Sequence, residues 1–172
     1  MRTLALLAAV LLAGCAGIPE GVSAIRGFEL NRYLGTWYEI ARLDHSFERG
    51  LIRVTAAYSL REDGGVKVIN RGFDPLKQEW REAIGKAYFV EGPDIGRLKV
   101  SFFGPFYGGY NIVDLDRENY SYSLVSGPTR SYLWILARNK KLEPATLKRL
   151  VDKAKALGFA TDKLIYVDQS DK

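Results

Sequence analysis

Hydrophobic and polar residues alternate along much of the chain, in short runs that are separated by turn residues. Between Val54 and Leu60, the larger apolar side chains stand at every second position. Residues 62–65 (Glu-Asp-Gly-Gly) follow, and this composition is typical of a tight hairpin turn. Period-two alternation places the two sets of side chains on opposite faces of a strand. The pattern therefore predicts a β-strand that turns directly into an antiparallel neighbour.

The same pattern recurs along the chain, and the segments follow one another without intervening helices. The expected strands are residues 37–42, 54–60, 66–73, 79–90, 97–103, 110–116, 120–126 and 131–138. Sequential strands joined by hairpin-length turns form a meander, which either closes into a barrel or splits into a sandwich. Closure removes exposed strand edges. We predict an all-β fold, an eight-stranded antiparallel up-and-down barrel.

One helix is expected after the last of these strands. Pro144 suits the first turn of a helix, and Gly158 suits a C-terminal cap. The apolar residues between them fall at spacings that share one face, namely Leu147, Leu150, Val151, Ala154 and Leu157. This helix should pack by that face against the outside of the barrel. A final short strand is expected over residues 163–167.

The N-terminal residues have the layout of a secretion signal. Arg2 precedes an unbroken apolar run over residues 4–12, and small residues lead to Cys15. The run is about half of the roughly 20 residues that a membrane-spanning helix needs. Residues 12–15 (Leu-Ala-Gly-Cys) resemble a bacterial lipobox, which implies cleavage before Cys15 and its acylation. The following Ala16, which is not aspartate, implies by the same resemblance a lipid-anchored protein of the outer membrane.

The chain is therefore expected to have three parts. Residues 1–14 are a signal peptide, residues 15–27 a lipidated N-terminal tether, and residues 28–172 the barrel domain. Residues 16–25 are mostly small or polar and include Pro19 and Gly21, which suits a flexible tether.

Composition excludes several classes of site. Cys15 is the single cysteine and His45 the single histidine, so neither an intrachain disulfide nor a Cys/His metal site is expected. The formal net charge of +5 comes from scattered residues, and no basic helix with interleaved aromatic residues is present. We expect no nucleic acid partner, no metal and no cofactor.

Two blocks about a hundred residues apart resemble the signatures of the lipocalin family. Residues 31–42 contain its Gly-x-Trp core, and residues 134–138 (Trp-Ile-Leu-Ala-Arg) resemble the block that ends in arginine. The middle block, residues 116–120, departs from the usual Thr-Asp-Tyr, which leaves the role of that loop open. Residues 102–110 and the lipobox together are similar to the bacterial outer-membrane lipocalins, relatives of apolipoprotein D. The resemblance covers essentially the whole mature chain and implies a lipocalin calyx.

This resemblance places Trp37 at the closed end of the barrel, with Arg138 stacked on its ring in a structural role. A guanidinium over an indole is a favourable cation–π contact. Period-two alternation then selects residues that face the interior, and the predicted ligand-binding residues are Tyr58, Asn70, Phe102, Tyr110, Tyr132 and Trp134. Buried tyrosine and asparagine need polar partners, which favours a pocket with a few polar anchors. The alternative is that these are core tyrosines with hydroxyls that reach solvent at the mouth.

The expected function is binding of a fatty acid or a lysophospholipid, for storage or transport of envelope lipids. Asp44-His45-Ser46 contains the residue types of a hydrolase triad, but no Gly-x-Ser-x-Gly elbow occurs, so we expect no enzymatic activity. The alternative is a structural or partner-binding lipoprotein with a filled barrel. It would act through a loop over residues 104–109, with exposed Phe106 and Tyr107. Apolar residues on such a loop could instead touch a membrane or mediate a homodimer.

Overall fold

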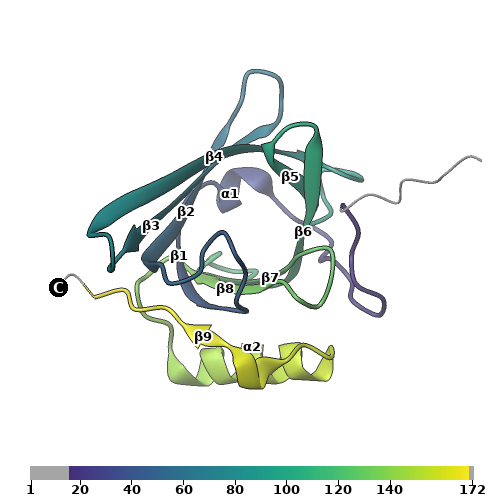
Figure 1. The fold of residues 1–172 in the computed structure, drawn as a ribbon. Coiled ribbons are helices and arrows are strands. Elements are labelled where there is room, and N and C mark those ends of the chain that lie inside the picture. Colours follow the sequence, from purple (N-terminus) through teal and green to yellow (C-terminus); the bar gives the residue numbers. More distant parts are fainter. Residues whose placement is uncertain (1–15, 171–172) are drawn as a thin grey trace, which may run out of the picture.

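Eight strands close into one barrel in the computed structural model, which describes residues 16–170 (Figure 1). The strands are β1 Gly35–Arg42, β2 Ile52–Leu60, β3 Val66–Asp74, β4 Glu79–Phe89, β5 Arg97–Phe103, β6 Phe106–Leu115, β7 Tyr122–Ser126 and β8 Leu133–Ala137. Each pairs antiparallel with the next, and β1 closes the barrel because it pairs with both β2 and β8. A short β9, Ile165–Tyr166, adds to the end of β1. The predicted eight-stranded up-and-down barrel is confirmed.

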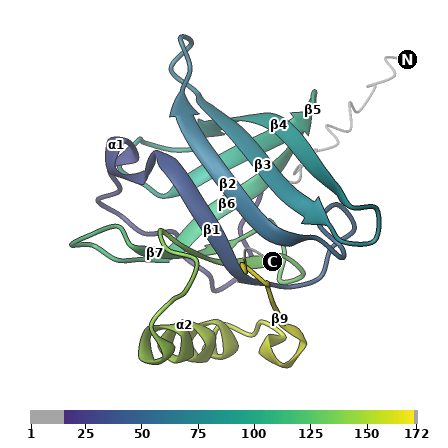
Figure 2. The same cartoon turned by 90° about the vertical axis from the view of Figure 1, so that its left-hand side faces the viewer.

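The predicted helix is also confirmed: α2 runs over Pro144–Ala156, outside the barrel (Figure 1). Gly158, just after it, has a φ of 84°, the left-handed conformation that glycine adopts most readily. Two short elements were not predicted, namely α1, Leu30–Tyr33, and the 3₁₀ helix η1, Thr161–Lys163. α1 lies across one end of the barrel (Figure 2). Among the described residues, no helix has the length and apolarity to cross a membrane.

The predicted loop over residues 104–109 is wrong. β6 begins at Phe106, and the ladder with β5 includes the pairs Val100 with Gly108 and Phe103 with Phe106. The turn is therefore only Gly104-Pro105. Glycine is depleted in strands in general, but backbone pairing with a neighbouring strand overrides this weak preference.

The segment before α1 also differs from its prediction. Val22 is 6% exposed and Phe28 is 4% exposed, so both are buried against the barrel. The backbone of Ile25 donates to Ile112 O at 2.9 Å and accepts from Gly96 N at 2.9 Å. The flexible tether expected over residues 16–25 is thus packed on the barrel wall from residue 17 onward. Cys15 and the signal peptide lie outside the described residues.

Two apolar cores result from the alternation along the strands. The inner core fills the end of the barrel next to α1 and includes Trp37, Leu98 and Ile112. The outer core lies between the barrel and α2, and it joins Ile135 of β8 to Leu150 of α2. Both of these side chains are fully buried.

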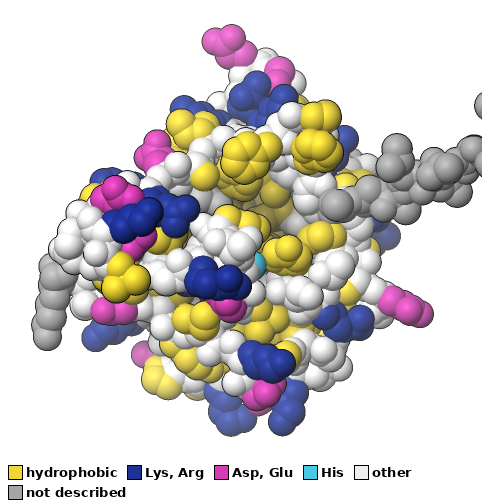
Figure 3. All heavy atoms as spheres, in the orientation of Figure 1, with side chains coloured by type: hydrophobic (Ala, Val, Ile, Leu, Met, Phe, Trp, Pro, Cys, Tyr) yellow, Lys and Arg dark blue, Asp and Glu magenta, His cyan; other side chains and the backbone are white. Residues whose placement is uncertain are grey.

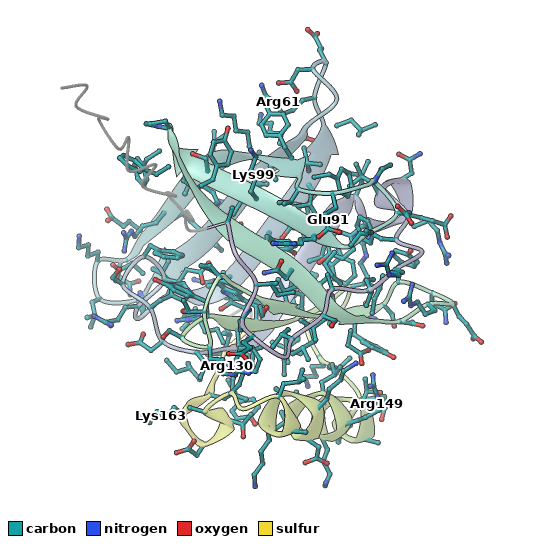
Figure 4. The ribbon with its side chains drawn as sticks, turned by 90° about the vertical axis from the view of Figure 1, so that its right-hand side faces the viewer. Arg61, Glu91, Lys99, Arg130, Arg149 and Lys163 are labelled. Atoms are coloured by element: carbon teal, nitrogen blue, oxygen red, sulfur yellow. The ribbon has the colours of Figure 1, made fainter. Side chains whose placement is uncertain are left out.

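One carboxylate fixes the position of α2 on the barrel. Asp114 Oδ2, on β6, lies 2.7 Å from Lys153 Nζ and 3.1 Å from Arg149 Nη1, both on α2. Figure 4 shows Arg149 on α2, below the barrel. Burial by itself raises the pKa of Asp114, but the hydrogen bonds from Arg149 and Lys153 outweigh it and hold the pKa below its usual value.

Replacement of this carboxylate should loosen α2. We expect Asp114→Asn to lower the free energy of unfolding at pH 7 by about 1 kcal/mol, because both cations are partly exposed. Since the folded-state pKa is depressed, this stabilisation is complete above the usual Asp pKa and is lost as the pH falls through the folded value. Urea denaturation at several pH values measures both effects. Asp152→Asn, which removes only an exposed pair with Lys148, is the control, and an equal loss in the control would contradict the assignment.

Candidate ligand-binding site

The end of the barrel next to α1 is closed by an indole. Trp37 lies in the first half of β1 and is fully buried. Its Nε1 donates a hydrogen bond to Tyr33 O at 2.8 Å, which ties the strand to the end of α1. The Tyr33 ring lies against the indole, with 4.6 Å between the two centroids. We call this end the base of the barrel.

Arg138 covers the base from outside. It follows directly after β8, and its Cζ lies 4.0 Å from the centroid of the Trp37 ring. Its guanidinium donates to four backbone carbonyls, at 2.8 Å to Arg32, 2.9 Å to Leu34, 3.0 Å to Thr36 and 3.3 Å to Tyr120. One side chain therefore joins the last strand of the barrel to the segment that leads into the first.

The inward-facing side chains are buried near the base and only partly buried at the other end, the mouth. The buried group consists of Tyr58, Val68, Ala87, Leu98, Ile112 and Leu136. The partly exposed group lies two or four residues nearer the mouth on the same strands and consists of Ala56, Asn70, Val100, Phe102, Tyr110 and Trp134. Side chains that face inward and still contact solvent line an open space. Figure 3 shows a hollow with hydrophobic side chains at this end.

A chain of hydroxyl groups forms the floor of this hollow. Tyr110 Oη lies 2.8 Å from Tyr58 Oη and 2.7 Å from Tyr33 Oη. Tyr33 Oη in turn donates to Ser123 Oγ at 3.2 Å. Burial raises the pKa of Tyr33 to about 12 and raises the pKa values of Tyr58 and Tyr110 well above their usual range. All three phenols therefore keep their protons at physiological pH.

The direction of these hydrogen bonds follows from the last bond in the series, the one from Tyr33 to Ser123. A phenol has a single hydrogen to donate. Because Tyr33 donates to Ser123, Tyr110 donates to Tyr33, and Tyr58 donates to Tyr110. Every phenolic hydrogen is then used within the protein. The floor offers lone pairs but no phenolic donor to a ligand.

The loop over residues 43–51 is held at the mouth by a buried cation. Arg42 is 1% exposed, and its Nη1 lies 2.7 Å from Glu39 Oε1. Its Nη2 donates to two carbonyl oxygens of the loop, at 2.8 Å to Glu48 and 3.2 Å to Leu51. The side chain of Arg42, the last residue of β1, thus holds the loop that leads into β2.

The carboxylate of Glu48 connects this loop to the opposite wall. Its Oε2 accepts a hydrogen bond from Trp134 Nε1 at 3.1 Å and lies 2.8 Å from His45 Nε2. The His45 ring packs on Phe47, with 4.0 Å between centroids, and the rings of Trp134 and Tyr132 stack at 6.1 Å. The mouth therefore combines an aromatic wall with a buried charged group.

The two buried carboxyl groups differ in their protonation. Burial, together with the nearby Glu48 carboxylate, raises the pKa of Glu39 well above its usual value. For Glu48, burial acts in the same direction, but the contacts from His45, Trp134 and Arg42 outweigh it and lower its pKa. Arg42, which pairs directly with Glu39, thus also helps to hold the pKa of Glu48 below its usual value.

The structure brings most of the predicted binding residues together around the hollow. Tyr58, Asn70, Phe102, Tyr110 and Trp134 stand on inward faces, and Tyr132 lies just before β8, at the mouth. Their contact with a ligand stays a prediction. The sequence interpretation missed the contributions of Tyr33, Glu39, Arg42 and Glu48. The signal was present for Glu39, since period two puts it on the same face as Trp37.

Asp44, His45 and Ser46 do not converge into a triad. Asp44 pairs with Arg49 at 2.8 Å, whereas His45 contacts Glu48. Within residues 16–170, no three His, Cys, Asp or Glu side chains are grouped so that they could hold a metal ion.

Loss of the base contact should affect stability rather than binding. We expect Arg138→Ala to lower the free energy of unfolding by about 2 kcal/mol, the sum of a cation–π contact and its partly exposed hydrogen bonds. Urea denaturation measures this loss, and Arg61→Ala, at an exposed hairpin, is the control. An unchanged stability with an altered ligand affinity would contradict the structural role.

Isosteric replacement of the two mouth carboxylates should give opposite results. Glu48→Gln should lower the free energy of unfolding at pH 7 by about 3 kcal/mol, because it removes a buried negative charge that His45, Trp134 and Arg42 stabilise. Glu39→Gln should cost little and should become progressively favourable as the pH rises, since a group with a raised folded-state pKa destabilises the protein above its unfolded pKa. Denaturation at pH 5 and pH 8 compares the two. Equal losses would contradict this difference between the two carboxyl groups.

Known proteins share both this sequence and this geometry. Residues 28–169 match the family model of the lipocalin-like domain. The outer membrane lipoprotein Blc of Vibrio cholerae is 58% identical over 95% of this chain and 96% of its own length. Apolipoprotein D of Mus musculus is 33% identical, over 84% of this chain and 78% of that protein. The structure of insecticyanin from the tobacco hornworm Manduca sexta superimposes with a TM-score of 0.70 at 20% identity, over 90% of this chain and 88% of that one. The chain therefore belongs to the lipocalin family, among its bacterial outer-membrane lipoproteins.

Proposed function

We propose that the barrel holds one fatty acid or lysophospholipid in its hollow and performs no chemistry on it. The observation that carries the proposal is the gradient along the inner wall, which is closed and apolar at the base and partly exposed at the mouth. An eight-stranded barrel is just wide enough to hold one small ligand. A slender acyl chain fits a long, narrow space of this kind.

The ligand should enter with its acyl chain first. The phenolic hydrogens at the floor are already used, so a carboxylate or phosphate would find no phenolic donor there. Asn70 and the indole of Trp134 lie higher on the wall, where the inner face still contacts solvent. The polar head therefore belongs at the mouth.

The apolar wall is sufficient to bind such a lipid. Each methylene that leaves water contributes about 0.8 kcal/mol. About twelve enclosed methylenes therefore contribute about 10 kcal/mol, against association costs that begin at about 4 kcal/mol. The remainder, at most about 6 kcal/mol, corresponds to a dissociation constant of roughly tens of micromolar.

Acylation of Cys15 is the second part of the proposal. The lipobox at residues 12–15 and the similarity to proteins named outer membrane lipoproteins support it. The anchor would keep the barrel next to the membrane that supplies or receives the lipid, as storage or transport of envelope lipids requires.

Direct titration tests the proposal. A soluble form that begins at Ala16 retains every described core residue; it would be stripped with organic solvent and titrated with palmitate and with lysophosphatidylcholine while tryptophan fluorescence is followed. We expect saturable one-to-one binding, and at least a tenfold loss of affinity in Trp134→Ala, which is equivalent to about 1.4 kcal/mol.

The control is Trp80→Phe, because Trp80 lies on the outer face of β4, beside Arg71. Its affinity should equal that of the wild type. A folded protein that takes up neither lipid would overturn the proposal and favour the filled-barrel scaffold. Light scattering of the same samples determines whether a homodimer forms.

A further inference from the structure

A small cleft on the outer wall of the barrel gathers positively charged side chains. Its volume is about 180 Å³, and its lining includes Tyr38, Arg53, Thr55, Arg71, Trp80 and Lys140. Tyr38, Thr55 and Arg71 form one row across β1, β2 and β3, because each pairs with the next in the strand ladders. We call this site the outer cleft. Three of its lining side chains are cations, and none is a carboxylate.

The C-terminal segment helps to build the outer cleft. β1 and β2 pair only as far as Tyr38 and Thr55, and the segment after β9 passes along this wall (Figure 1). Asp168 O accepts a hydrogen bond from Arg53 N at 2.7 Å. Gln169 Nε2 donates to a carbonyl oxygen of each strand, at 2.7 Å and 2.9 Å. The cleft is therefore formed by segments that are distant in sequence and held together by hydrogen bonds.

The backbone of Arg53 adopts an unusual conformation at this site. Its φ is 50°, in the left-handed region that residues other than glycine adopt at a cost. The register of β2 with β3 shifts between Ile52 and Thr55, so Arg53 lies in a bulge. Bulges re-aim side chains and are frequent next to functional sites. The Arg53 guanidinium lies over Phe73, with 4.1 Å from Cζ to the ring centroid.

Two guanidinium groups share one indole in the outer cleft. The Cζ atoms of Arg71 and Arg53 lie 4.2 Å and 5.0 Å from the centroid of the Trp80 ring. Their like charges repel each other at such a short separation. A bound anion would remove this repulsion.

No carboxylate of the described chain neutralises these two charges. Six arginines form ion pairs with carboxylates within residues 16–170, and neither Arg53 nor Arg71 is among them. This holds although Glu82 stands opposite Arg71 in the β3–β4 ladder. Arg53 Nε is also buried and has no hydrogen-bond partner among the described residues. A buried donor without a partner calls for an explanation, and a bound anion supplies one.

We propose that the outer cleft binds a phosphate monoester group between the guanidinium groups of Arg53 and Arg71. Such a group carries a charge of about −1.5 to −2 at pH 7, which matches two guanidinium groups. The planar fork of arginine donates two parallel hydrogen bonds to phosphate oxygens. The volume is below the roughly 300–1,000 Å³ of pockets for drug-sized ligands, so a small group fits best.

The outer cleft and the hollow lie on opposite faces of the same strands. Asn70 faces the hollow, and Arg71, the next residue of β3, faces the cleft. A lipid in the hollow and a phosphate group in the cleft therefore do not compete. The inference depends neither on the proposed lipid binding nor on acylation of Cys15. Its ligand is either a soluble phosphate monoester or the headgroup of phosphatidic acid, since both present the same phosphate.

Nuclear magnetic resonance of nitrogen-bound protons tests the inference. The soluble form that begins at Ala16 is labelled with ¹⁵N and titrated with glycerol 3-phosphate at pH 7. Sodium chloride keeps the ionic strength constant, so that general screening does not change. We expect saturable shifts of the Arg53 Nε–H signal and of the Trp80 indole signal. The indole signal of Trp37, at the base, should not move. Shifts that do not saturate would overturn the inference.

Substitutions show whether the two guanidinium groups hold the ligand. Arg53→Gln and Arg71→Gln should each weaken binding at least tenfold, which is equivalent to about 1.4 kcal/mol. Arg81→Gln is the matched control, because it removes the same charge beside Trp80 but does not line the cleft. Its affinity should equal that of the wild type, and circular dichroism verifies that all variants fold. Equal losses in the control would indicate general electrostatic attraction and would overturn the site.

Vesicles distinguish the two sources of the phosphate. If the headgroup is the ligand, the protein should sediment with phosphatidylcholine vesicles that contain phosphatidic acid, and Arg53→Gln should abolish this where Arg81→Gln does not. Binding of glycerol 3-phosphate without sedimentation would assign a soluble phosphate monoester. A folded protein that binds neither would overturn the inference.

Palmitate titration separates this inference from the proposed lipid binding. Arg53→Gln should bind palmitate as the wild type does, because its side chain lies outside the barrel. Loss of palmitate binding in this variant would place Arg53 at the hollow and would overturn the outer site. Wild-type protein that binds glycerol 3-phosphate but no palmitate would overturn only the proposed lipid binding and would support the outer site.

Discussion

The stacking of Arg138 on Trp37 is the contact on which the rest of the barrel depends. An up-and-down barrel closes only where its last strand meets its first, and Arg138 follows directly after that last strand. Its guanidinium donates hydrogen bonds to carbonyls at the end of α1, which the short helix leaves without partners. With this end sealed, the inward residues toward the other end need not fill the barrel, and a hollow remains.

The mouth differs from the base, because buried charged side chains hold its loop in place. Arg42 and Glu48 are both almost fully removed from solvent. Burial of charges is costly unless they are paired, so this group contributes less to stability than the apolar base does. Its value lies in geometry, because the ion pair of Arg42 with Glu39 and the hydrogen bonds from Arg42 to two loop carbonyls fix one arrangement of the 43–51 loop. The loop is therefore held in place at the mouth mainly by polar contacts.

The sequence predicts the fold well because one physical rule, alternation with period two, governs most of the chain. It correctly separates Val68 and Leu98, which face inward, from their outward neighbours. The rule does not predict what depends on contacts between distant segments. The strand over Phe106–Gly109 forms because β5 lies beside it, and Glu39 is tolerated inside the barrel because Arg42 is near. The packing of the N-terminal segment likewise depends on distant residues, such as Asn111, whose side chain donates to Gly17 O.

The packing of the N-terminal segment affects how freely the barrel can move relative to a lipid anchor. A flexible tether would let the barrel take any orientation, so that the membrane would only raise the local concentration of lipid. A segment fixed on β6 transmits the position of the anchor to the barrel, because Asn111 and Arg130 leave it little freedom. The contacts that hold this segment therefore make it a part of the fold and not a flexible linker.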